Sequence, residues 1–227
     1  MQQIKSASWL LFGLNGLLNI FAVATQNQDL NYITKPLLMP LLALSLWLSA
    51  GNEHRIARNL VLLGLLLSTG GDTLLMLTHR PDFFIFGLIC FLLAHVFYIL
   101  AFRMLAVGRK GYVARHIWLF TPFLLYWLAF NAYLYNDLPA GLKLPVLVYS
   151  IAIMIMGVFA LNLRDIIPRW AFLFIFIGAM LFLVSDSILA LGRFKFTDGN
   201  FGIPIMVSYI LGQFGIAFGT SKTTGGH

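Results

Sequence analysis

Long apolar runs alternate with short polar breaks along this chain. A helix needs about 20 mostly apolar residues to span a bilayer, and non-helical backbone exposed to lipid is costly. Reading between the breaks predicts eight spans within one domain, residues 1–220, followed by a polar tail, 221–227. The predicted spans are 6–25, 32–50, 58–78, 82–106, 115–135, 143–163, 168–192 and 199–219. The pattern therefore predicts an all-α polytopic membrane protein, a bundle of eight transmembrane helices.

The first span has two features of a secretory signal peptide. Lys5 is a basic flank, and Ala22-Val23-Ala24 fits a small-residue cleavage site. The apolar stretch is long for a signal peptide, which favours a retained helix. A removed segment that leaves seven spans is the alternative.

Composition agrees with the pattern. Hydrophobic residues make up 60% of the chain and charged residues 10%, whereas a soluble domain has about 45–50% and about 25%. The mean hydropathy is +0.88. Cys90 is the only cysteine. These values exclude a soluble globular domain, a disordered chain and a disulfide-stapled secreted domain.

The net charge of +7 lies in the loops between the spans, where anionic lipid headgroups are nearer partners than nucleic acid. With eight spans, ten of the fifteen Lys and Arg residues fall on the side of the two termini. The opposite side holds Lys35, Arg80, Lys143, Arg193 and Lys195. The positive-inside rule therefore predicts that both termini are cytoplasmic. We expect an integral protein of a plasma membrane, such as a bacterial inner membrane.

Three short motifs in the first half of the chain have similar counterparts in the second half. The pairs are Gly71-Asp72-Thr73-Leu74-Leu75-Met76 with Ser185-Asp186-Ser187-Ile188-Leu189-Ala190, Lys35-Pro36 with Lys143-Leu144-Pro145, and Phe86-Gly87 with Phe201-Gly202. Because each half holds an even number of spans, such repeats would be parallel rather than inverted. Two parallel four-helix repeats are therefore a hypothesis.

Polar side chains from different spans are predicted at one depth. Asp72, Asp186 and Asn19 each lie six residues from the outer end of their span, which places them about 9 Å below that boundary. Lys35 enters its span about one turn above this layer. An ionisable group inside a bilayer costs about 2.5–3.5 kcal/mol, so such residues are by default functional.

Two carboxyl groups in one apolar site disfavour each other's charge, so one can stay protonated and act as a general acid. Lys35 can hold the other ionised, meet a substrate phosphate, or extend to the headgroups. The structural alternative is that Asp72 and Asp186 only join neighbouring helices by hydrogen bonds.

Further polar residues occur in pairs at helical spacing. His95 and Tyr98 share one face of the fourth span, and Tyr209 and Gln213 share one face of the eighth. Together with Asn19 on the first span, they are predicted to line a polar cavity or to join helices.

His95 is the one histidine well inside a span, and zinc hydrolysis needs two or three close histidines. No nucleophile elbow or P-loop is present. We therefore expect neither a metal nor an organic cofactor.

The order and spacing of several motifs resemble the YhhN-like lysoplasmalogenase family. The motifs are Thr34-Lys35-Pro36-Leu37-Leu38-Met39-Pro40, Gly71-Asp72-x-x-Leu75-Met76, Phe86-Gly87, Ala94-His95-x-x-Tyr98 and Ser185-Asp186-Ser187. The resemblance implies an eight-span enzyme that hydrolyses the vinyl ether bond of lysoplasmalogens, releasing a fatty aldehyde and a glycerophospho-alcohol. It implies functional roles for Lys35, Asp72, His95, Tyr98 and Asp186.

On this interpretation the catalytic residues are Asp72, Asp186, His95 and Tyr98. The carboxyl pair supplies the acid and stabilises the oxocarbenium ion, as paired carboxylates do in glycosidases. The predicted substrate-binding residues are Lys35, Asn19, Tyr209 and Gln213. The expected partners are a lysophospholipid and the lipid bilayer. Two alternatives are a proton- or cation-coupled transporter that uses the same acids, and a non-catalytic lipid-binding protein.

Overall fold

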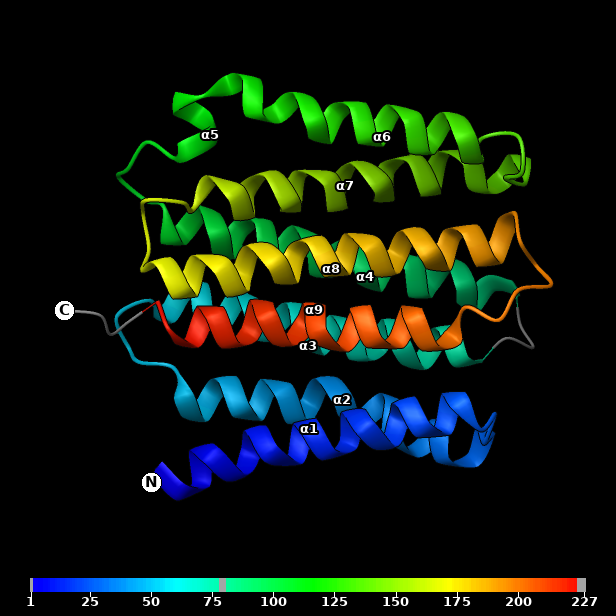
Figure 1. Ribbon diagram of the computed structural model, residues 1–227, viewed down its shortest axis with the longest axis horizontal. Coiled ribbons are helices and arrows are strands. Elements are labelled where there is room, and N and C mark those ends of the chain that lie inside the picture. Colours follow the sequence, from blue (N-terminus) through cyan, green and yellow to red (C-terminus); the bar gives the residue numbers. More distant parts are fainter. Residues whose placement is uncertain (1, 78–80, 224–227) are drawn as a thin grey trace.

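The computed structural model describes residues 2–77 and 81–223. Within them, long helices lie side by side along one axis (Figure 1), and eight are long and apolar enough to cross a membrane. The predicted all-α polytopic fold is therefore confirmed. The helices are α1 (Gln2–Ala24), α2 (Gln28–Ser49), α3 (Arg55–Met76), α4 (Pro81–Leu105), α5 (Tyr112–Arg115), α6 (Thr121–Leu134), α7 (Lys143–Asn162), α8 (Arg169–Phe194) and α9 (Gly202–Ser221).

Helix ends differ from the predicted spans by a few residues, for local reasons. The helix α2 begins four residues early because the Asn27 side chain caps it, accepting a hydrogen bond of 3.0 Å from the Leu30 backbone N–H. The fifth span is not one continuous α-helix from residue 115. A 3-10 turn, Ile117–Phe120, precedes α6, and Pro122 lies in the first turn, where proline starts helices. The predicted end of the third span at 78, the loop residues 79–80 and tail residues 224–227 lie outside the described residues.

The helices form a layered bundle in which α1 and α6 lie at opposite edges (Figure 1). The described ends of the chain lie at the same end of the bundle, as an even number of spans requires. Neighbouring helices pack in equivalent ways in the two halves: α3 on α4 and α8 on α9, and likewise α4 on α7 and α2 on α9. Two parallel repeats would produce this arrangement, and the repeat itself stays a hypothesis.

Glycines bring α8 and α9 into backbone contact. A Cβ atom at Gly215 would lie 2.6 Å from the carbonyl oxygen of Phe174, and one at Gly219 would lie 2.8 Å from that of Ala171. Small residues four apart allow such close approach of membrane helices. The motif Gly215-x-x-x-Gly219 thus acts in helix packing, as its spacing predicts.

Apolar side chains cover the outside of the bundle, and polar side chains are buried within it. Leu17 and Leu66 are more than half exposed, whereas Asn19, His95 and Gln213 have no exposed surface. A lipid environment favours this distribution because lipid is as apolar as a protein core. The buried polar groups are therefore the candidates for a functional site.

Candidate active site

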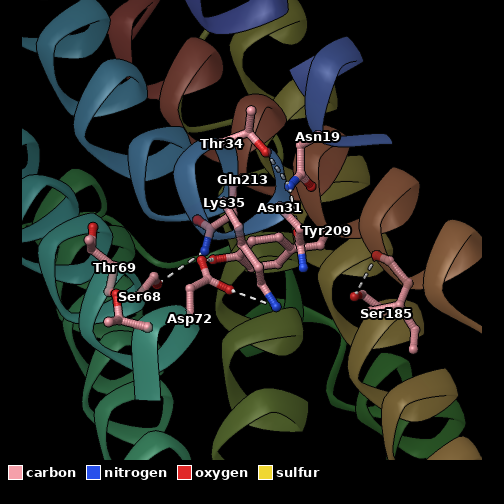
Figure 2. Close-up of polar contacts among 12 residues, drawn as sticks. Asn19, Asn31, Thr34, Lys35, Ser68, Thr69, Asp72, Ser185, Tyr209 and Gln213 are labelled. Carbon is pink, nitrogen blue, oxygen red and sulfur yellow. Dashed lines mark hydrogen bonds and ion pairs between the residues drawn. The ribbon is translucent and has the colours of Figure 1, made fainter. Parts of the chain in front are cut away.

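The first of two polar clusters surrounds Asp72 (Figure 2). The Tyr209 hydroxyl of α9 donates a hydrogen bond of 2.7 Å to Oδ2 of Asp72, and Nζ of Lys35 lies 3.8 Å from its Oδ1. The Asp72 side chain is 4% exposed and that of Lys35 is 18% exposed. Lys35 therefore turns inward to form an ion pair between α2 and α3 rather than extending to the headgroups.

Gln213 extends this cluster one turn further along α9. Its Oε1 accepts a hydrogen bond of 2.7 Å from the Tyr98 hydroxyl, and its Nε2 donates one of 3.1 Å to Oγ of Ser68. All three side chains are buried. The network joins α3, α4 and α9 across the centre of the bundle.

Asn19 joins α1 to α2 beside the same cluster (Figure 2). Its Nδ2 donates to Oδ1 of Asn31 at 2.9 Å and to Oγ1 of Thr34 at 3.0 Å. Thr34 precedes Lys35 in α2. Asn19 thus holds the segment that carries the cation of the Asp72 pair.

The second cluster surrounds Asp186 on α8. The Tyr149 hydroxyl of α7 donates a short hydrogen bond to Oδ2 of Asp186. Nε2 of His95 lies 3.9 Å from the same oxygen, and the His95 ring meets the Tyr149 ring edge-on at 5.1 Å. Both clusters thus pair a carboxyl group, buried at Asp72 and partly exposed at Asp186, with a tyrosine hydroxyl from another helix.

Aromatic rings separate the two clusters. Phe182 lies 4.8 Å from the His95 ring and 5.5 Å from the Tyr209 ring, and Phe91 contacts both Phe182 and Tyr209. No hydrogen bond among the described residues joins Asp72 to Asp186. The acids therefore act as neighbours rather than as a directly bonded pair.

A mostly apolar cavity opens beside Asp186 and not beside Asp72. Its empty volume is about 800 Å³, including space open to the surroundings, and α3, α4, α6, α7 and α8 line it. The lining residues with polar groups are Tyr126, Trp127, Asn131, Tyr149, Ser150, Asp186, Ser187 and Arg193. An apolar cavity with a few convergent polar groups is typical of a ligand-binding site.

The helix α6 forms a loosely packed wall of this cavity. Leu134 is its one buried residue. The Tyr126 hydroxyl on α6 shares a hydrogen bond of 2.7 Å with Oγ of Ser187 on α8. One wall of the cavity is therefore formed by a helix whose side chains are mostly not buried against the rest of the bundle.

The predicted site residues divide between the clusters. Asp186 lines the cavity, with His95 beside it. The other predicted site residues, which belong to the Asp72 cluster and do not line the cavity, are Lys35, Asn19, Asp72, Tyr98, Tyr209 and Gln213. No three His, Cys, Asp or Glu side chains in the described part of the chain lie close enough to hold a metal ion.

Sequence reasoning missed Tyr149 and Arg193. A signal for Tyr149 was present, because it lies six residues inside the outer end of its predicted span, at the depth of the two aspartates. A phenol hydroxyl at that depth can hydrogen-bond a carboxyl group from a neighbouring helix, as Tyr149 does with Asp186. A signal for Arg193 was also present, because it follows Asp186 by two helical turns on the same face of the span.

The fold and the site define a class: an integral membrane protein whose described residues include eight helices able to span a membrane, with a polar site between them. A profile of the YhhN family matches residues 30–220. The chain therefore belongs to the YhhN family. The matched range includes both aspartates and His95, and it begins after Asn19.

The relatives of this chain include proteins that carry an enzyme name. Lysoplasmalogenase of Mycobacterium bovis (strain ATCC BAA-935 / AF2122/97) is 34% identical over 160 residues, which cover 68% of this chain and 58% of that protein. Lysoplasmalogenase TMEM86A of Bos taurus is 32% identical over 160 residues, which cover 69% of this chain and 63% of that protein. The match thus spans less than two thirds of these relatives. No solved structure is significantly similar to the chain.

Proposed function

We propose that this protein hydrolyses the vinyl ether bond of lysoplasmalogens inside the membrane, releasing a fatty aldehyde and a glycerophospho-alcohol. One observation carries the proposal: an apolar cavity between the helices contains a single carboxyl group, Asp186, held by Tyr149 and adjacent to His95. The names of the two relatives support the same reaction.

Asp186 is the general acid in this proposal. No Lys or Arg in the described part of the chain pairs with it, and a carboxylate without a cation is costly in apolar surroundings. The protonated carboxyl gives its proton to the alkene carbon distant from the ether oxygen. The product is an oxocarbenium ion beside a carboxylate, which stabilises it.

Water then attacks the oxocarbenium carbon and returns a proton to Asp186. The hemiacetal that forms breaks its bond to the glycerol oxygen and yields aldehyde and alcohol. We assign His95 to positioning this water, because two polar atoms 3.9 Å apart can both contact one water molecule. Tyr149 donates to the carboxylate that forms when Asp186 loses its proton.

The Asp72 cluster has a supporting role in this mechanism. Lys35 lies close enough to Asp72 to favour its ionised form. Tyr209 fixes the Asp72 carboxylate, while Asn19 holds the helix that carries Lys35. The network of Tyr98 and Gln213 fixes α4 and α9 around both clusters. These residues thus position charge rather than contact substrate.

We also propose that the cavity faces the non-cytoplasmic leaflet and that both termini are cytoplasmic. The excess of Lys and Arg on the side of the termini, ten against five, supports this orientation. Asp186 lies in the half of α8 toward the opposite end of the bundle. A lysolipid of the outer leaflet would then reach the acid without crossing the membrane.

The test is aldehyde release from lysoplasmenylethanolamine by the purified protein in lipid nanodiscs. We expect Asp186→Asn to lower kcat about 10²- to 10⁴-fold, the usual contribution of a general acid. Ser187→Ala is the matched control, because Ser187 lines the same cavity without an acid and should keep most of the activity. Circular dichroism and thermal unfolding establish that each variant is folded.

Two results would contradict the proposal: no aldehyde from folded wild type, or full activity in folded Asp186→Asn. Uptake of protons or cations into liposomes by a wild-type protein without hydrolase activity would instead favour a transporter. An Asp186→Glu variant keeps the carboxyl group, so partial activity there would separate lost chemistry from lost folding.

A further inference from the structure

Arg193 is the one cationic side chain among the described residues that line the cavity. It lies in the last turn of α8, and its guanidinium stands over the Phe84 ring, 5.0 Å from the ring centroid. No carboxylate in the described part of the chain pairs with it. By contrast, Lys195 donates a hydrogen bond of 2.6 Å to Asp137, which neutralises that neighbouring cation.

A guanidinium that stacks on an aromatic face keeps its N–H groups free at its edge. Those groups match the oxygens of a phosphate, to which arginine donates two parallel hydrogen bonds. The contact with Phe84 holds the side chain at the cavity by a cation–π interaction. Arg193 is therefore oriented and unneutralised at the end of the cavity where lipid headgroups lie.

The spacing between Arg193 and Asp186 matches the length of the substrate. The two residues are seven apart on α8, so they share a face and are separated by about 10.5 Å along the helix. In a lysoplasmalogen, the phosphorus and the alkene carbon that accepts the proton are about seven bonds apart, roughly 8 Å of extended chain. A phosphate at Arg193 thus places this carbon beside Asp186.

Beyond Asp186 the cavity is lined mainly by apolar side chains, including Ile153, Met154 and Leu183. These lie further from the headgroup end of the bundle, so an alkenyl chain in contact with them points toward the bilayer centre. A lipid in a leaflet has this same orientation. The substrate therefore enters from the membrane without turning over.

We propose that Arg193 binds the phosphate of the lysolipid and so fixes which bond meets Asp186. The inference rests on the proposed function and makes it more specific, because it requires a phosphate at a set distance from the vinyl ether. An alkenyl glycerol without phosphate then binds weakly, although it contains the same scissile bond.

Measuring the affinity of lipid probes that cannot be hydrolysed tests the phosphate contact of Arg193 independently of catalysis. The probes are a saturated 1-alkyl glycerophosphoethanolamine, which has no double bond to protonate, and 1-alkyl glycerol, titrated against the protein in detergent. We expect Arg193→Gln to weaken binding of the phosphate-containing probe about 10- to 100-fold, as for one lost charge-assisted contact. Binding of the alkyl glycerol should stay the same. Arg193→Lys should restore part of the difference.

Lys195→Gln is the matched control, since it removes a nearby cation that is already paired with Asp137. Equal weakening of both probes in Arg193→Gln, or no weakening, would overturn the proposal, as would an equal effect of Lys195→Gln. Hydrolysis of the corresponding alkenyl lipids is then measured separately. Phosphate-dependent binding without aldehyde release would refute the hydrolase and leave the binding site standing.

Discussion

Two tyrosines make the same bond to two different acids, and this offers a matched pair of substitutions. Tyr149 donates its hydroxyl hydrogen to Asp186, and Tyr209 donates its own to Asp72. Both tyrosines are at most 9% exposed. Tyrosine to phenylalanine removes one hydroxyl and keeps the ring, so each variant deletes one hydrogen bond with little change in packing.

The expected effects differ because the two acids have different charges in the proposed mechanism. A hydrogen bond to a neutral group contributes about 0.5–1.5 kcal/mol, and one to a charged group about 1.5–3 kcal/mol. The bond from Tyr149 changes from the first kind to the second as Asp186 loses its proton. The gain of about 1–1.5 kcal/mol occurs only in the transition state, so Tyr149→Phe should lower kcat about 5- to 13-fold.

Tyr209→Phe removes a bond to an acid that is ionised throughout. We therefore expect a loss of about 1.5–3 kcal/mol in stability, more than for Tyr149→Phe, with a smaller change in kcat. The assay combines initial rates of aldehyde release at saturating substrate with thermal unfolding in detergent. An unchanged kcat in Tyr149→Phe, or an equal loss in both variants, would refute the assignment of Asp186 as the acid.

Three further predictions concern packing and charge. Gly215→Ala should lower Tm and cost about 1–3 kcal/mol, because the new Cβ atom would lie 2.6 Å from a backbone carbonyl oxygen of α8. Lys35→Met should cost about 3–5 kcal/mol by leaving Asp72 without its cation, and adding Asp72→Asn should recover most of this loss in an unfolding assay. The hydrogen bond to Asp137 raises the pKa of Lys195 above its usual 10.5, so the ion pair stabilises the fold at neutral pH and is lost as pH rises past that raised value. The Tm difference between wild type and Lys195→Met should therefore be constant near neutral pH and shrink at strongly alkaline pH.

The spans were predictable because hydropathy over about 20 residues depends on composition rather than on tertiary contacts. The common depth of Asp72 and Asp186 stays a prediction, because it depends on where each span ends: Asp72 lies four residues, about 6 Å, before the end of α3, and Asp186 lies eight residues, about 12 Å, before the end of α8. Local chemistry moved the ends, as the Asn27 cap did at α2 and Pro122 did at α6.

The division of the polar layer into two clusters was not predictable from the chain. Depth is one coordinate, and the others depend on which helices are neighbours and how each is rotated. The rings of Phe182 and Phe91 pack between the Asp72 cluster and the Asp186 cluster and keep them apart. In sequence, both residues resemble any other apolar residue of a span. Tyr149 was hidden in the same way, because an aromatic residue in a span is typical of a core.

The depth of the polar layer has a physical explanation in the proposed reaction. In a leaflet, the vinyl ether bond of a lysoplasmalogen lies roughly 8 Å below its phosphate, and Asp186 lies eight residues, about 12 Å, below the end of α8 at Phe194. An enzyme that cleaves this bond in place needs its acid at that depth and its water near the headgroups. An acid at the bilayer centre would meet only the alkyl chain, and one in a loop would meet only the headgroup. The position of Asp186 two turns below Arg193 thus follows from where the bond lies in the membrane.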